Sequence, residues 1–234
     1  MAFRVAALCK TEGIPPELVC NLDQTAVHLR PSTEQTYEVK GVKEVKCLGK
    51  DDKRQITAVV SSTASGELVP LQLVFQGKTE AVVPKDEDVK RAVAVGCHLT
   101  MSENHWSNFV TMKSFVEKVL DLWRVKKCEE LGLAPDSQKM VWLIDCWKVH
   151  ISAGFREWML DLFPLIKTMF VPVNCTNKLQ VANVVLQRPL KHRFRQQFNI
   201  WQAQQVALQV LGKVEPKDIK LDLGVKELQG KVVG

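Results

Sequence analysis

One short apolar run limits the folds open to this chain more than any other feature of its sequence. Every residue of Met140–Ile144 is apolar, and the run ends at Asp145. So short a run is too brief for a buried helix, but it is typical of a strand that is covered on both faces of a sheet. Such a strand needs helices on both sides, so we expect a layered α/β domain.

The other patterns in the sequence supply the strands and helices of this domain. Further strand-like runs cover 18–23, 54–60, 68–75 and 166–172, and helical periodicity covers 108–127, 152–162 and 179–211. A turn at Ser65–Glu67 predicts an antiparallel hairpin, and Pro189 should begin a second helix or kink the first. Residues 79–103 suggest an irregular excursion with little core of its own. We therefore predict a mixed sheet of three antiparallel strands, then alternating helices and strands, flanked by helices.

The chain divides into one main domain and two short ends. With 234 residues, 46% of them hydrophobic, it can bury a core without disulfides. Residues 1–16 predict the remnant of a helix that stops at the break Gly13–Pro16. Residues 17–211 form the predicted domain, and residues 212–234 form a tail with no legible element.

Composition excludes several classes of protein. The longest apolar stretches are too short to cross a bilayer, and the first residues lack a signal-peptide core. The seven cysteines contain no Cys-x-x-Cys pair, which argues against a zinc ribbon or a redox site and favours reduced thiols. We expect a soluble intracellular protein with no membrane partner.

Positive charge gathers in one segment. The net charge is only +6, but Arg188, Lys191, Arg193 and Arg195 lie close together in the last helical pattern. Such a cluster favours a polyanionic partner, although most charge clusters are simply solvated helix faces.

Two acids fall where strand-like runs end. Asp23 follows the run that begins at Leu18, and Asp145 follows Met140–Ile144. The carboxyl ends of neighbouring strands form the crevice where α/β sheets bind ligands, and paired carboxylates suit Mg²⁺. The alternative is that each aspartate caps a turn. Spacing alone does not decide between them.

The sequences around the two acids resemble known motifs. Asn21–Val27, which contains Asp23, resembles the first acidic motif of DDE transposases of the mariner/pogo superfamily. Leu143–His150, in which His150 follows Asp145 by five residues, resembles the second.

A third block is the most distinctive. In Val171–Pro189 a Pro-x-Asn-x-Thr loop leads to Leu-Gln and then to Asn183, in the place of the family's last catalytic acid. Residues 53–79 also resemble the family's hairpin between the first two acids. The resemblance thus runs from about Val19 to about Phe198.

The resemblance implies a fold, a reaction and a set of site residues. The implied fold is ribonuclease-H-like, and the implied reaction is metal-dependent DNA strand cleavage and transfer in the nucleus. The implied catalytic and metal-binding positions, which would hold two Mg²⁺ or Mn²⁺ ions, are Asp23, Asp145 and Asn183. DNA is the implied partner, a homodimer on DNA is possible, and the residues implied to contact DNA are Arg188, Lys191, Arg193, Arg195 and His150. His150 could equally be a helix-start residue with a satisfied ring.

Asn183 is the departure from the family that matters. It keeps a carbonyl oxygen but brings no negative charge. A lost unit charge about 4 Å from a divalent ion, at an effective dielectric of about 20, forfeits on the order of several kcal/mol, so activity should fall by orders of magnitude. Glu157 or Asp161 could in principle replace the missing acid.

Three functions therefore remain open at this point. The first is a transposase or endonuclease core that is impaired by Asn183. The second is a catalytically dead DNA-binding domain derived from a transposon. The third is an unrelated ribonuclease-H-like nuclease that acts on RNA.

Overall fold

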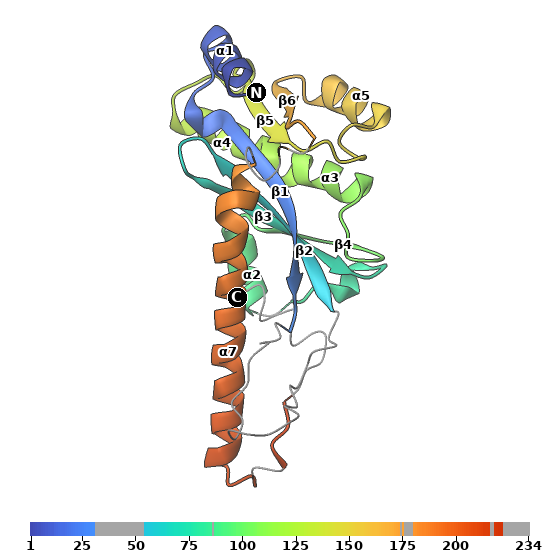
Figure 1. Cartoon of the computed structure of the whole chain (residues 1–234), viewed down its shortest axis with the longest axis vertical. Helices are drawn as coiled ribbons and strands as arrows, with labels where there is room; N and C mark the ends of the chain where they lie inside the picture. The colour runs from blue at the N-terminus through green and yellow to red at the C-terminus, as the bar shows by residue number, and fades with distance from the viewer. Residues whose placement is uncertain (31–53, 86, 174, 176–179, 216–217, 222–234) are drawn as a thin grey trace.

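A six-stranded mixed sheet, in the order β4-β3-β2-β1-β5-β6, forms the centre of the domain (Figure 1). The computed structural model describes residues 1–30, 54–85, 87–173, 175, 180–215 and 218–221. The strands are β1 Val19–His28, β2 Gln55–Thr63, β3 Leu68–Gln76, β4 His98–Ser102, β5 Met140–Ile144 and β6 Ile166–Phe170. Strands β1, β2 and β3 are antiparallel neighbours, whereas β4, β5 and β6 join in parallel. All strands except β2 therefore point their carboxyl ends to one edge.

Both faces of the sheet are buried, which follows from the alternation of side chains along β2. Ile56, Ala58 and Val60 pack into a core shared with Phe198 and Trp201 of the last helix. Val59 points the other way, into a larger core that includes Trp142 and the first helices. Successive side chains of a strand point to opposite faces, so a strand this apolar is stable only with cover on both sides.

Helices supply that cover. They are α1 Ala2–Glu12, α2 Glu87–Ala94, α3 Phe109–Phe115, α4 Asp121–Glu130, α5 Ala153–Leu162 and α7 Gln187–Leu211, with π-helical turns η3 Val116–Leu120 and η4 Ala182–Leu186 and 3₁₀ turns η1 Pro16–Leu18 and η2 Glu80–Val82. Local sequence sets several of their ends. Gly13 ends α1 in the left-handed conformation at φ 62°, Asn108 begins α3 with a capping box, and Ser152 caps α5.

The helical pattern predicted over 179–211 contains one wide turn. Segment η4 runs directly into α7, which starts two residues before Pro189. Proline has no N–H to donate, so a π-helical turn just before it fits the missing hydrogen bond. Figure 1 shows α7 running alongside the sheet and continuing past it.

The predicted α/β architecture, a mixed sheet flanked by helices, is confirmed, with two corrections. Residues 79–103 are not an irregular excursion, because they contain α2 and the edge strand β4, whose His98 pairs with Gln72 of β3. Asp23 does not end its strand, because β1 continues to His28 against β2. Both errors arose where a strand is half-buried or polar and its apolar pattern is weak.

The described residues also bear on the expectations about membrane spans, cysteines and the C-terminal tail. Among the described residues, no helix combines the length and the apolarity that crossing a membrane requires. The cysteines at positions 9, 20, 97, 128, 146 and 175 are free thiols. Most of the predicted tail, residues 216–217 and 222–234, lies outside the described part of the chain.

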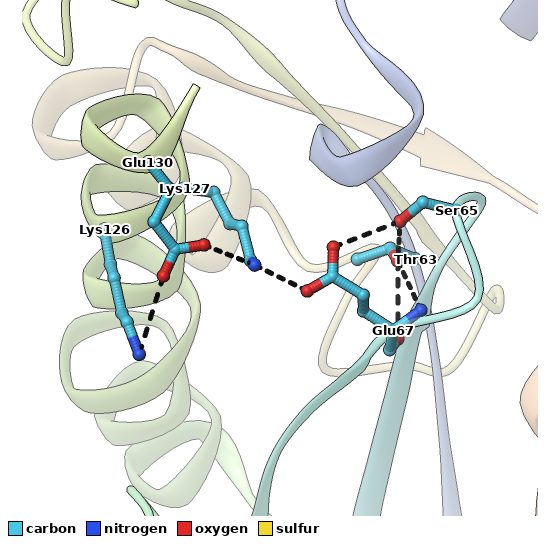
Figure 2. Close-up of polar contacts among 6 residues, drawn as sticks. All are labelled: Thr63, Ser65, Glu67, Lys126, Lys127 and Glu130. Atoms are coloured by element: carbon cyan, nitrogen blue, oxygen red, sulfur yellow. Dashed lines mark hydrogen bonds and ion pairs between the residues drawn. The ribbon is translucent and has the colours of Figure 1, made fainter. Parts of the chain in front are cut away.

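A lysine joins the β2–β3 turn to α4 (Figure 2). The Nζ atom of Lys127 lies 2.5 Å from a carboxylate oxygen of Glu67 and 2.5 Å from one of Glu130. Glu67 is itself held in the turn, because its backbone N–H donates to Thr63 Oγ1 at 3.0 Å. The Lys127 side chain is only 12% exposed, so these contacts are shielded from solvent more than an ordinary surface pair.

Replacing Lys127 with methionine should lower the thermal midpoint by roughly 2–4 °C, because the apolar stem stays while both ion pairs are lost. Lys126→Met is the matched control, since Lys126 is 70% exposed and its pair with Glu130 spans 3.7 Å. Differential scanning calorimetry of both variants measures the effect. Equal midpoints for the two variants would contradict the bracing role.

Candidate functional site

Asp23 and Asp145 lie at matching positions of two neighbouring parallel strands. The last registered pair between β1 and β5 joins Asn21 to Leu143, and each acid lies two residues further along its own chain. Side chains at matching positions of parallel strands point to the same face. The structure therefore brings the two predicted acids together, one inside β1 and one directly after β5.

The surroundings of Asp23 disfavour its charge. Burial, together with the nearby charge of Asp145, raises the pKa of Asp23 to about 6. Hydrogen bonds from the Gln24 backbone N–H, at 2.9 Å, and from the Gln187 side chain oppose this rise. A carboxyl group with a perturbed pKa beside a second carboxylate is a marker of a functional site.

His150 is in hydrogen-bond contact with Asp145. Its Nδ1 atom lies 2.8 Å from Asp145 Oδ1, and the ring packs within 6.0 Å of the rings of Trp142, Trp147 and Phe155. His150 is 1% exposed, so the structure encloses its ring among these side chains. A hydrogen bond from a buried ring of this kind can hold a carboxylate in one orientation.

Two buried amides fix the residues just before Asn183 against β1. Asn21 accepts a hydrogen bond from the Ala182 N–H at 3.0 Å and donates to the Leu143 carbonyl at 3.2 Å. Gln180 donates to the Leu22 carbonyl at 2.7 Å. These bonds fix the start of the last helix against β1 and β5, and half-buried Asn183 follows directly after Ala182.

Gln187 also reaches the site. Its Nε2 atom donates to Asp23 Oδ2 at 2.6 Å and to the Gln24 carbonyl at 3.3 Å. Residues 183 and 187 are four apart, so they share one face of the helix. The structure thus adds an amide to the three predicted positions.

The predicted DNA-contacting cations lie on the exposed side of α7. Arg188, Lys191, Arg193 and Arg195 are all exposed. Three of them, Arg188, Lys191 and Arg195, recur at steps of three and four and form one stripe. The opposite side of the helix carries the residues that pack on the sheet, namely Leu186, Leu190, Phe194, Phe198 and Trp201.

The acids fit one hard cation better than two. Mg²⁺ takes oxygen ligands and is commonly held by one or two carboxylates, with water and substrate phosphates completing the shell. Asp23 and Asp145 provide such a pair. Glu157 and Asp161 do not complete a set of three, because both are exposed on α5 and no group of three or more His, Cys, Asp or Glu side chains in the described part of the chain could hold a metal.

Three residues of the site were not assigned roles from sequence. Asn21 and Gln180 stood inside the motifs, but their hydrogen bonds between distant segments are visible only in the structure. Gln187 could have been found from its spacing of one helical turn after Asn183.

Comparison with known proteins finds the same family over a range that overlaps most of the motif resemblance. A family model described as DDE superfamily endonuclease matches residues 53–217, a range that includes Asp145 and Asn183 and begins after Asp23. The proteins described as "Pogo transposable element with KRAB domain" from Mus musculus and from Homo sapiens are each 24% identical over 199 residues. Each match covers 84% of this chain and 30% of the relative, so the chain spans about a third of the relatives' length.

Solved structures of two complexes share a broad likeness with the chain. The Mos1 transposase paired-end complex with left transposon end aligns with a TM-score of 0.49 at 10% identity, covering 98% of this chain and 56% of that chain. The Mos1 mariner paired end complex with Mn aligns with a TM-score of 0.45, also at 10% identity and with the same coverage.

Proposed function

Because this chain belongs to the DDE superfamily endonuclease family, we propose that it is a DNA-binding transposase core whose metal-dependent strand cleavage is impaired at Asn183. The observation that carries the proposal is the pairing of Asp23 with Asp145 beside the start of the last helix. The pogo transposable element relatives support DNA as the substrate. A homodimer on DNA and a nuclear location stay predictions.

Each site residue has a role in this proposal. Asp23 and Asp145 would hold Mg²⁺ or Mn²⁺, and Asn183 would offer a carbonyl oxygen. The bound ion would supply activation of the attacking water or 3′-hydroxyl and stabilisation of the leaving oxygen. His150 keeps the Asp145 carboxylate in one orientation, and Asn21 keeps residue 183 beside both acids.

Charge on α7 would supply the affinity for DNA. Lys and Arg side chains that neutralise phosphates release counterions, which gives binding that weakens as salt rises. Arg188, Lys191 and Arg195 lie on one exposed stripe of the helix that begins at the site.

A catalytically dead DNA-binding domain is the second candidate. Two observations favour it: residue 183 is an amide, and the Gln187 amide already occupies Asp23 Oδ2. Both candidates bind DNA, but only an impaired enzyme would retain nicking that depends on Asp23.

DNA binding is tested first. Fluorescence anisotropy over a salt series should show that Arg188→Gln/Lys191→Gln weakens duplex binding by roughly tenfold and lowers the log–log salt slope by about two. Arg4→Gln/Lys10→Gln, which removes two exposed charges from α1, is the matched control. Identical salt slopes for the two double variants would overturn the assignment of DNA to α7.

Cleavage is tested in the same preparations. Plasmid nicking with Mg²⁺ or Mn²⁺ should be close to background in the natural chain, and any remaining nicking activity should vanish in Asp23→Ala. Rapid nicking that Asp23→Ala abolishes would contradict the impairment, and no nicking dependent on Asp23 would identify the dead domain.

A further inference from the structure

The side chain of Gln187 donates a hydrogen bond to Asp23, the acid of the first motif. Its Nε2 atom lies 2.6 Å from Asp23 Oδ2 and 3.3 Å from the Gln24 carbonyl oxygen. A backbone carbonyl and an ionised carboxylate only accept hydrogen bonds, so the amide must turn its nitrogen, not its oxygen, toward them.

This contact and a second hydrogen bond place one donor on each oxygen of Asp23, so a cation must compete with them for the carboxylate. Its other oxygen, Oδ1, already accepts the Gln24 backbone N–H at 2.9 Å. The amide N–H groups of Gln187 carry partial positive charge and lie on the carboxylate oxygen that remains. A hydrogen bond to a charged group is stronger than one between neutral groups. A divalent cation that displaces the Gln187 amide must break this bond, which lowers the affinity of Asp23 for the cation.

The helix that carries Gln187 is held in place and cannot easily withdraw. Ala182, at the start of the preceding π-helical turn, is hydrogen-bonded to Asn21, and Gln180 is fully buried against Leu22. Leu190, about one turn later, packs against the core that contains Phe198 and Trp201. Displacing the amide therefore requires its side chain to rotate, because the backbone is fixed.

We propose that Gln187 competes with divalent cations for Asp23 and keeps the acidic pair in a metal-free, hydrogen-bonded arrangement. The inference rests on the proposed function, since it takes Asp23 and Asp145 as the cation site. It identifies a second residue, besides Asn183, that lowers the affinity of this chain for metal.

Calorimetric titration of the full chain with Mn²⁺ tests the competition. Gln187→Met keeps the length of the side chain and removes the donor, so it should bind Mn²⁺ about tenfold more tightly than the natural chain. Gln197→Met, at an exposed position of the same helix, should change nothing. Asp23→Ala should abolish binding in either background.

Nuclear magnetic resonance gives a second readout that does not depend on the variant folding well. In the natural chain, the Gln187 side-chain amide signals should shift as diamagnetic Mg²⁺ is added at millimolar concentration, because the amide leaves Asp23. Unshifted Gln187 signals with bound Mg²⁺, or equal Mn²⁺ affinity for Gln187→Met and the natural chain, would overturn the competition.

The outcomes separate this inference from the proposed function. If Asp23→Ala leaves Mn²⁺ binding intact, the proposed cation site is wrong. If binding requires Asp23 but Gln187→Met leaves it unchanged, only the competition is wrong. If no variant binds Mn²⁺ at millimolar concentration, both fail, while DNA binding through α7 can still hold.

Discussion

Asn183→Asp is expected to raise Mg²⁺-dependent nicking of supercoiled plasmid by at least about a hundredfold over the natural chain. The substitution adds a negative charge beside the two acids without changing the shape of the side chain. A unit charge about 4 Å from a divalent ion, at an effective dielectric of about 20, is worth several kcal/mol, and about 1.4 kcal/mol corresponds to tenfold in rate. A hundredfold gain is therefore a modest part of the available electrostatic energy.

The controls for this prediction use the same helix and the same acids. Asn199→Asp adds an equal charge at an exposed position of α7 and should leave nicking at background. Asn183→Asp/Asp23→Ala should lose the whole gain, because the new carboxylate together with Asp145 does not replace Asp23. Nicking that stays at background in Asn183→Asp, with Mn²⁺ binding tighter than in the natural chain, would show that the missing acid is not what limits cleavage.

The central layer of the fold was predictable because its sequence signals are local and strong. Met140–Ile144 is apolar throughout and forms β5 with those bounds, and Ser152 caps α5 as its position before the helical pattern indicates. Strand β4 escaped prediction for the opposite reason. His98–Ser102 is a short edge strand, mostly half-buried, and it becomes a strand through pairing with β3. Pairing of that kind leaves little trace in the sequence.

The candidate site divides in the same way. Two acids near strand-like runs, together with the motifs around them, predicted that Asp23 and Asp145 would meet. The burial of His150 and the reach of Gln187 depend on how distant elements pack, because Trp142 and Phe155 enclose the first and the anchoring of Ala182 by Asn21 aims the second. Residue type alone could assign His150 to phosphate or to structure, and only the packing decides.

Asp23→Asn is expected to stabilise the folded chain at neutral pH and to have only a small effect near pH 4. The pKa of the Asp23 carboxyl is about 6 in the folded state, against 3.8 for a free side chain. Between these two values the folded state retains a proton that the unfolded state has lost, so the stability of the natural chain falls as pH rises. Above about pH 6 both states are ionised, and the full cost of burying the charge is present.

The size of the effect follows from the pKa difference. About two pKa units correspond to roughly 3 kcal/mol at most, and the incomplete burial of the carboxyl reduces this to about 1–3 kcal/mol. Urea unfolding near pH 4 and near pH 7.5 measures the change, with Asp136→Asn at an exposed position as the matched control. A less stable Asp23→Asn at pH 7.5 would mean that the bonds from Gln24 and Gln187 outweigh burial. The expected gain would mean that ionised Asp23 destabilises the fold and that a divalent cation bound beside it would offset this cost. An acid that lowers stability in this way is typical of a residue that serves chemistry and not stability.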